Sequence, residues 1–195
     1  MMEKHLFLTG PTGIGKTRLL RSALGKKLAM AGGLITEAVY GTYGELNGFS
    51  LAPAAASGNV VGYDTQLFLD CRQFPPHTDN EVYRHTGVLL LEQALWYPYA
   101  LLDEFGGFEL IIPQFRDALT SLLHSDLPIL GALKTEEEAD AMRQALGLGD
   151  KYLIYAHALR TYLKNDRNTR LLDLSVLSEE SAEQAIREWI QEYLS

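Results

Sequence analysis

The chain has 195 residues, of which 47% are hydrophobic and 22% charged, an ordinary composition for a soluble globular protein. Its formal net charge of −8 argues against nucleic acid or an anionic membrane as a partner, because an acidic surface repels phosphate groups. No apolar run approaches the ~20 residues of a membrane-spanning helix, a glycine loop follows too soon for a signal peptide, and the single cysteine, Cys71, excludes an internal disulfide. We therefore expect one domain, residues 1–195, in the cytoplasm.

The N-terminal half of the chain alternates short apolar runs with segments of helical spacing. Residues 6–8 are apolar and predict a buried strand that ends before Gly10. Residues 16–31 carry apolar side chains at helical spacing, and the Gly32-Gly33 pair is typical of a helix end. The elements expected next are a strand at 34–40, a returning hairpin strand at 49–54, a strand at 65–69 and a short helix at 88–96.

The C-terminal half continues the alternation. An apolar strand is predicted at 99–102, and a helix at 113–123 has proline in its first turn. The elements expected after these are a strand at 128–133, a helix opened by Thr135 and its acidic first turn, a helix at 152–163, a strand at 171–174 and a helix ending at 194. This order indicates an α/β fold: a mostly parallel central sheet with helices on both faces and an added antiparallel hairpin.

A glycine-rich loop follows the first predicted strand. Residues 10–17 match the pattern G-x-x-x-x-G-K-[ST] without a substitution. Its glycines let backbone N–H groups point at phosphate oxygens, and the following helix adds its positive N-terminal dipole. Lys16 is expected to contact the β- and γ-phosphates, and the Thr17 hydroxyl to bind Mg²⁺. We therefore expect a P-loop NTPase fold with these nucleotide-binding residues: Gly10, Pro11, Thr12, Gly13, Ile14, Gly15, Lys16 and Thr17.

A carboxylate pair follows the apolar strand predicted at 99–102. Asp103 stands where a strand-end carboxylate anchors Mg²⁺, commonly through water. Glu104 comes next and can orient or deprotonate a water that attacks the γ-phosphate. Without the loop, a strand that simply ends in solvent would explain the pair equally well. With it, we predict Thr17 and Asp103 as metal ligands and Glu104 and Lys16 as catalytic residues, which favours hydrolysis over phosphoryl transfer.

Several segments beyond the loop carry a resemblance to a known family. Residues 103–110, Asp-Glu-Phe-Gly-Gly-Phe-Glu-Leu, look like its D-E-h-G-x-h-E-L signature. Residues 33–37, Gly-Leu-Ile-Thr-Glu, are similar to its G-h-h-T-E strand, and residues 82–88 and 130–132 match two further segments more loosely. Along most of residues 5–134, the chain thus resembles the small P-loop nucleoside-triphosphatases first described in thermophiles, which include the human cancer-related nucleoside-triphosphatase.

This resemblance implies slow hydrolysis of ATP, GTP and other nucleoside triphosphates with little base selectivity. It also implies the additional-strand order, in which another strand is inserted beside the strand of the phosphate loop. The Asn-Arg pair that the family has near its C-terminal end is missing after Leu174. No base-recognising residue is therefore carried over from that end.

Some other polar residues are weaker candidates. Arg84 is predicted to reach the phosphates and neutralise developing charge, although a surface salt bridge is equally compatible with its position. Glu37 stands at a predicted strand end, where it would touch metal-bound water or solvent. Lys134 and Thr135 follow a predicted buried strand, where γ-phosphate sensors lie in related folds. For Glu109, capping or solvent contact fits better than catalysis.

Two other functions stay open on the sequence alone. The first is a small-molecule or nucleotide kinase whose basic cluster closes as a lid over the phosphates. One solvated helix face explains that cluster as well, and its members are Arg160, Lys164, Arg167 and Arg170. The second is a nucleotide-dependent switch that hydrolysis only resets. A protein partner, the preferred base and the pathway are not indicated by any motif.

Overall fold

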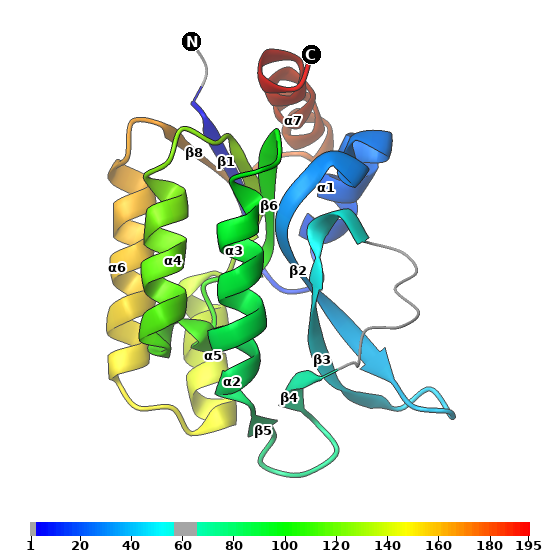
Figure 1. Cartoon of the computed structure of the whole chain (residues 1–195), viewed down its shortest axis with the longest axis vertical. Coiled ribbons are helices and arrows are strands. Elements are labelled where there is room, and N and C mark those ends of the chain that lie inside the picture. Colours follow the sequence, from blue (N-terminus) through cyan, green and yellow to red (C-terminus); the bar gives the residue numbers. More distant parts are fainter. Residues whose placement is uncertain (1–2, 57–65) are drawn as a thin grey trace.

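An eight-stranded sheet forms the centre of the part of the chain that the computed structural model describes, residues 3–56 and 66–195 (Figure 1). Its strands are β1 His5–Thr9, β2 Ala31–Tyr40, β3 Leu46–Pro53, β4 Leu67–Asp70, β5 His77–Thr78, β6 Tyr99–Phe105, β7 Ile129–Leu133 and β8 Thr169–Asp173. The order is β5-β4-β3-β2-β6-β7-β1-β8. Every pair from β2 to β8 in this order is parallel, whereas β3, β4 and β5 add antiparallel pairs at the other edge.

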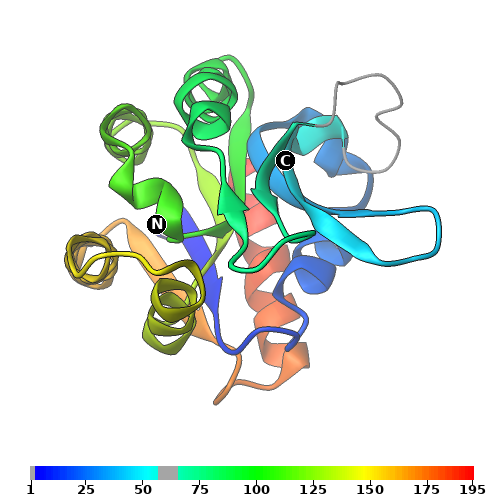
Figure 2. The ribbon, with the colours of Figure 1, turned by 90° about the horizontal axis from the view of Figure 1, so that it is seen from below.

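Helices cover both faces of this sheet. They are α1 Lys16–Leu24, α2 Asn80–Val82, α3 Val88–Ala94, α4 Pro113–Leu123, α5 Glu136–Leu146, α6 Lys151–Asn165 and α7 Glu179–Tyr193. Seen from below, the green and yellow helices α3 to α6 lie on one side of the sheet, and the blue and red helices α1 and α7 lie on the other (Figure 2). The predicted α/β class, with its mostly parallel sheet and antiparallel hairpin, is confirmed.

The central parallel strands are rich in apolar residues because helices bury both of their faces. Every residue of β1 and of β7 is buried. Successive side chains of a strand point to opposite faces, so Phe7 packs with the α3–α6 layer while Leu6 and Leu8 pack with α1 and α7. On the second face, the fully buried Trp189 meets Tyr99 edge-on with their rings 5.9 Å apart.

Local signals start several helices where the sequence predicts them. Pro113 begins α4, because its fixed φ suits the first helical turn and its missing N–H is not needed there. The Thr135 side chain accepts a hydrogen bond from the Glu138 amide, and the Glu138 side chain accepts one from the Thr135 amide, which makes a capping box at the start of α5. Ser178 caps α7 in a similar way by accepting from the Ser181 amide.

The predicted helix at 16–31 is wrong in its second half. α1 ends at Leu24, a 3₁₀ segment covers Gly25–Met30, and Gly32 and Gly33 lie inside β2 instead of ending a helix. A Cβ added to Gly33 would lie 2.4 Å from the carbonyl oxygen of Leu101 on β6, and one added to Gly32 would lie 2.6 Å from the Cα of Ala94. These glycines therefore allow close packing around β2, a role that local sequence does not separate from helix termination.

The helix predicted at 88–96 corresponds to α3, which continues a helical stretch that starts at Asn80. Asp79 caps α2, a π-helical segment Tyr83–Gly87 follows, and α3 continues from Val88 to Ala94. The strand predicted at 65–69 corresponds to β4, Leu67–Asp70, and Thr65 lies outside the described residues.

Among the described residues, no helix combines the length and the apolar character that crossing a membrane requires.

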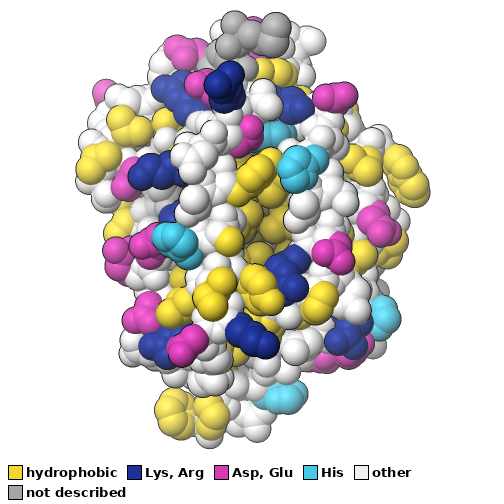
Figure 3. Space-filling model, turned by 90° about the vertical axis from the view of Figure 1, so that its left-hand side faces the viewer, with side chains coloured by type: hydrophobic (Ala, Val, Ile, Leu, Met, Phe, Trp, Pro, Cys, Tyr) yellow, Lys and Arg dark blue, Asp and Glu magenta, His cyan; other side chains and the backbone are white. Residues whose placement is uncertain are grey.

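The outer helical face carries a hollow between α4 and α6. Figure 3 shows hydrophobic side chains gathered along this hollow, with charged side chains around its rim. Its volume is about 280 Å³, and Leu119, Leu123 and Tyr155 are among its walls. No residue of the glycine loop lines it, so it is separate from the site described next.

Candidate active site

The phosphate loop and Lys134 follow β1 and β7, and the carboxylate pair lies near the end of β6, just before its last residue, Phe105. β1, β6 and β7 are mutually parallel, and β7 lies between the other two. Their carboxyl ends therefore meet at one edge, which is where open α/β sheets bind ligands. The inserted position of β7 is the additional-strand order that the sequence resemblance implied.

The glycine loop has the backbone that its sequence predicts. Gly10, Gly13 and Gly15 adopt φ values of 136°, 82° and 100°, a region that residues with a Cβ rarely enter. α1 begins directly after them, at Lys16. The Lys16 side chain is buried, and its Nζ donates to the carbonyl oxygens of Gly10 at 2.6 Å and Pro11 at 3.3 Å. The carbonyl groups of the loop thus surround the ammonium group of Lys16.

Thr17 and Asp103 are joined directly. The Thr17 Oγ1 donates a hydrogen bond of 2.8 Å to the Asp103 Oδ1. Asp103 is only 2% exposed, and burial raises the pKa of its carboxyl to about 6, against the opposing effect of the hydrogen bond from Thr17. A hydroxyl and a buried carboxylate at one point form an all-oxygen donor set, the kind that Mg²⁺ prefers.

Glu104 has a strained backbone and lies between two lysines. Its φ of 63° is the only positive value at a non-glycine residue in the described part of the chain, and the β6–β7 register shifts between Leu102 and Phe105 around it. Such strain persists where the surrounding structure enforces it, commonly at functional sites. The carboxylate accepts a hydrogen bond of 2.9 Å from the Lys134 Nζ and lies 3.8 Å from the Lys16 Nζ.

Lys134 and Glu109 are two further charged residues beside Glu104. Burial acts to lower the pKa of Lys134, but the carboxylates around it, Glu104 first, outweigh burial and the pKa is raised. Glu109 is buried and accepts hydrogen bonds of 2.7 Å from the amides of Gly106 and Gly107. It therefore ties down the turn that follows Glu104, in line with the capping interpretation. Burial raises the pKa of its carboxyl.

Glu138 is part of the site, and no sequence motif placed it there. Its Oε1 accepts hydrogen bonds from the Thr12 hydroxyl at 2.6 Å and from the Lys16 Nζ at 3.2 Å. Its Oε2 accepts from the Thr135 amide in the capping box of α5. Burial acts to raise the pKa of Glu138, but these bonds, the one from Thr12 first, lower it overall. The Thr-x-x-Glu spacing predicts the cap from sequence alone. The contact of Glu138 with the loop depends on the pairing of β1 with β7, which the spacing does not indicate.

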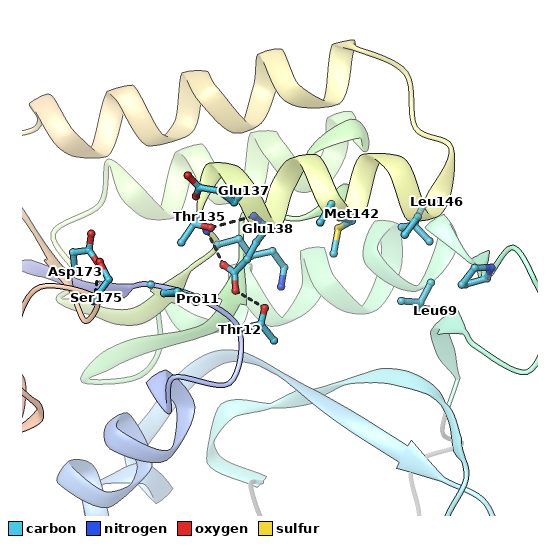
Figure 4. Close-up of a pocket in the computed structure, with 15 residues that line it drawn as sticks. Pro11, Thr12, Leu69, Thr135, Glu137, Glu138, Met142, Leu146, Asp173 and Ser175 are labelled. Atoms are coloured by element: carbon cyan, nitrogen blue, oxygen red, sulfur yellow. Dashed lines mark hydrogen bonds between the residues drawn. The ribbon is translucent and has the colours of Figure 1, made fainter.

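Two of the cavities that border the loop have volumes that suit a nucleotide. The larger, about 730 Å³, runs along α5; Asp173 and Ser175 lie at one end, Leu69 and Leu146 at the other, and Thr12 and Glu138 meet between them (Figure 4). The second, about 430 Å³, has these residues among its walls: Gly13, Gly15, Lys16, Thr17, Arg21 and Glu104. The loop, the Thr17 end of the Thr17–Asp103 pair and Glu104 therefore border one space large enough for phosphate groups.

Other candidate residues lie elsewhere. Arg84 is in the π-helical segment, pairs with Glu81 and lines neither of these two cavities. Glu37 is on β2, opposite Ser50 of β3, and lines neither cavity.

The basic cluster does not form a free flap in the described structure. Arg160 and Lys164 lie on α6, and Arg170 lies on β8. α6 packs against the sheet through the fully buried Leu163 and Tyr152. Arg160 is partly buried, which lowers its pKa, and the acidic start of α5 acts on it in the opposite sense. This packing argues against α6 as a lid.

Comparisons with known proteins agree with this geometry. The model of a family described as NTPase matches residues 5–155, more than half of the chain. Among solved structures, THEP1 from the hyperthermophile Aquifex aeolicus is similar, with a TM-score of 0.63 and 16% identity over 93% of this chain and 96% of that one. This likeness shows a shared fold. No curated protein matches the chain. On the family match, the chain belongs to the NTPase family of P-loop nucleoside-triphosphatases.

Proposed function

We propose that this protein is a Mg²⁺-dependent phosphohydrolase that removes the γ-phosphate of ATP, GTP and other nucleoside triphosphates with low base selectivity. The observation that carries the proposal is the meeting of the Thr17–Asp103 pair with Glu104 beside the loop lysine. The phosphate-binding lysine, the Thr17 hydroxyl that is bonded to Asp103, and the carboxylate for the attacking water thus border one cavity. We assign the whole chain, residues 1–195, to one such catalytic domain.

Thr17 and Asp103 are the residues that would hold Mg²⁺. Both present oxygen, and the hydrogen bond between them places the two donors side by side. When bound, the ion supplies positive charge that offsets the charge of the phosphate oxygens. Lys16 supplies a second positive charge at the loop, where its Nζ would exchange the carbonyls of Gly10 and Pro11 for phosphate oxygens.

Glu104 is the proposed general base. A water between Glu104 and the γ-phosphate would form a new P–O bond as the bond to the β-phosphate oxygen breaks, and the carboxylate would take the proton of that water. The flanking ammonium groups of Lys16 and Lys134 hold the carboxylate in place. The contact of Lys134 with Glu104 supports its proposed role as a phosphate sensor.

Low base selectivity is supported by the larger cavity. Much of its wall along α5 is apolar, with Ala141, Met142 and Leu146 among its residues. At the other end, the Asp173 Oδ1 already accepts from the Ser175 amide and hydroxyl. Apolar walls hold a ring without reading its hydrogen-bonding edge, so purines and pyrimidines should both be accepted.

The test is a phosphate-release panel with ATP, GTP, CTP and UTP, each with and without Mg²⁺. We expect release from all four, dependent on Mg²⁺, and loss of both binding and release in Lys16→Ala. Release that persists in excess chelator would contradict the metal assignment. Release from a single nucleotide would contradict low selectivity, and very slow turnover together with a triphosphate-dependent protein partner would favour the switch.

A further inference from the structure

A third cavity, about 330 Å³, lies against Glu104 and is walled by aromatic rings. Phe49, Phe68, Tyr83 and Phe108 line it. Their rings form one connected cluster: Phe49 and Phe68 stack at 6.4 Å, Phe68 and Phe108 lie 5.8 Å apart, and Tyr83 meets Phe108 edge-on at 5.5 Å. The side chains come from β3, β4 and the segments before and after β6, so the cavity lies toward the antiparallel edge of the sheet.

Glu104 is the wall that this cavity shares with the phosphate cavity. It borders the loop space together with Lys16 and Thr17, and it borders the aromatic space together with Lys134. Thr12 of the loop also lines the aromatic cavity. The group proposed to deprotonate the attacking nucleophile is therefore reachable from two sides, and one of these sides is built to hold a ring.

We propose that the aromatic cavity binds a small, neutral, ring-bearing alcohol whose hydroxyl accepts the γ-phosphoryl group in place of water. This inference rests on the proposed function, because it uses the same triphosphate donor and the same base. A volume of about 330 Å³ falls in the range of small-ligand sites. Aromatic walls favour a flat ring, which can stack or meet them edge-on.

The charges around the cavity select against an anionic acceptor. Glu104 and the buried Glu109 both line it. The single lysine among its walls, Lys134, already pairs with Glu104. A nucleoside or an aryl alcohol suits these charges, whereas a nucleoside monophosphate would bring its own negative charge beside two carboxylates.

The transfer is balanced with the groups present. The acceptor oxygen forms a bond to the γ-phosphorus as the bond between that phosphorus and the β-phosphate oxygen breaks. Glu104 takes the hydroxyl proton. The products are a nucleoside diphosphate and a phosphate monoester of the alcohol, and no oxidant or reductant is needed.

The test measures nucleoside diphosphate, free phosphate and phosphate monoester in parallel, with γ-labelled ATP and Mg²⁺. The probes are benzyl alcohol, thymidine, cytidine and adenosine; glycerol serves as the ring-free alcohol and AMP as the anionic one. We expect at least one ring alcohol to give a monoester and to lower the ratio of free phosphate to diphosphate. Glycerol and AMP should leave that ratio at one.

Two variants localise the effect. Ala38 of β2 is exposed and lines the cavity, so Ala38→Phe should fill it and lower the ratio of monoester to free phosphate at least tenfold. Val39 points to the opposite face of the same strand, and Val39→Phe is the matched control, which should keep the wild-type ratio. Equal effects of the two variants would contradict the placement of the acceptor.

The outcomes separate this inference from the proposed hydrolysis. Free phosphate equal to diphosphate with every alcohol overturns the acceptor and leaves the hydrolase standing. Diphosphate that forms only with a ring alcohol, as its monoester, supports the acceptor and overturns hydrolysis as the function. No diphosphate in any reaction overturns both.

Discussion

The Thr17 Oγ1 lies 2.8 Å from the Asp103 Oδ1 and donates a hydrogen bond to it, which joins the first turn of α1 to β6 across 86 positions of the chain. This contact places two metal-type oxygens together although β7 lies between β6 and β1, the strand that precedes the loop. It also brings a carboxylate into a site that is almost closed to solvent, and this burial raises the pKa of Asp103 to about 6.

Asp103→Asn should stabilise the Mg²⁺-free protein at pH 8. Burial raises the pKa of Asp103 from 3.8 to about 6 in the folded state, so the folded state binds more protons than the unfolded chain between these pH values. The contribution of this group to stability therefore falls as pH rises from about 4 to 6 and stays low above that. Thermal unfolding should give a higher Tm for the variant at pH 8, and the gap should close toward pH 4.

The same variant should lose metal-dependent turnover, because an amide cannot replace a carboxylate as a charged ligand. Asp117→Asn, a change at an exposed residue of α4, serves as the control for charge loss. If the wild-type protein is more stable than Asp103→Asn at pH 8 without metal, the buried carboxylate does not oppose folding.

Glu104→Gln should lower kcat by roughly 10²–10⁴-fold, the usual contribution of a general base. Binding of the triphosphate should persist, because the loop and Lys16 are untouched. The measurement is single-turnover phosphate release beside a direct binding titration. Turnover at the wild-type rate would remove Glu104 from the chemistry.

Glu104→Gly should be more stable than Glu104→Ala, the reverse of the usual order of these two residues. Both changes remove the carboxylate and leave Lys134 without it, so their difference reports the backbone alone. At φ 63° glycine is unstrained, and the difference should be about 1 kcal/mol. Chemical denaturation of the two variants measures it, and an alanine variant at least as stable would contradict the strain.

Glu138→Gln should tighten triphosphate binding by roughly fivefold, about 1 kcal/mol. Glutamine retains the capping role at the third helical position, but it removes a negative charge that contacts Lys16 and Thr12. Glu137→Gln is the matched control, because Glu137 is the neighbouring residue and lines the same cavity. Titration with a non-hydrolysable triphosphate gives the comparison, and equal affinities for the two variants would rule out competition by Glu138.

His5 should make the protein sensitive to mild acid. Burial, and then the charge of Lys4, lower the pKa of His5 from 6.5 to about 4. The unfolded chain therefore takes up a proton that the folded chain refuses, so the stability from this group is lost as pH falls from about 6.5 to 4. His5→Phe keeps a ring against Phe7 and should lose this dependence. Comparing variant with wild type at each pH isolates it from the opposite trend of Asp103.

The parts of the site that follow one another along the chain could be predicted from the sequence. The loop, the carboxylate pair and the helix starts at Pro113 and Thr135 each depend on chemistry confined to a few residues. The apolar run before Asp103 is short and ends in a carboxylate pair, which is typical of a buried strand that reaches the edge of a sheet. These local features also specify the α/β alternation and with it the sheet.

Features set by packing could not be predicted. A glycine pair ends a helix or permits close approach, and only the neighbouring strand decides: Gly33 faces the carbonyl of Leu101. The sequence gives no sign of the positive φ of Glu104, because glutamate is not a residue that favours this backbone conformation. The contact between Lys16 and Glu138 joins residues 122 positions apart, which no spacing rule covers.

The capping box of α5 has a thermodynamic consequence. Glu138 uses one oxygen to hold the start of its helix and the other to hold Lys16 and Thr12. A ligand that draws Lys16 away alters the bonding of the residue on which the first turn of α5 depends. Ligand binding to the loop and unfolding of that first turn are then coupled equilibria. The amount by which binding changes the free energy of unfolding the turn equals the amount by which unfolding the turn changes the free energy of binding. Because α5 packs against α6, a change in the first turn of α5 on ligand binding would also affect the outer helical layer of the protein.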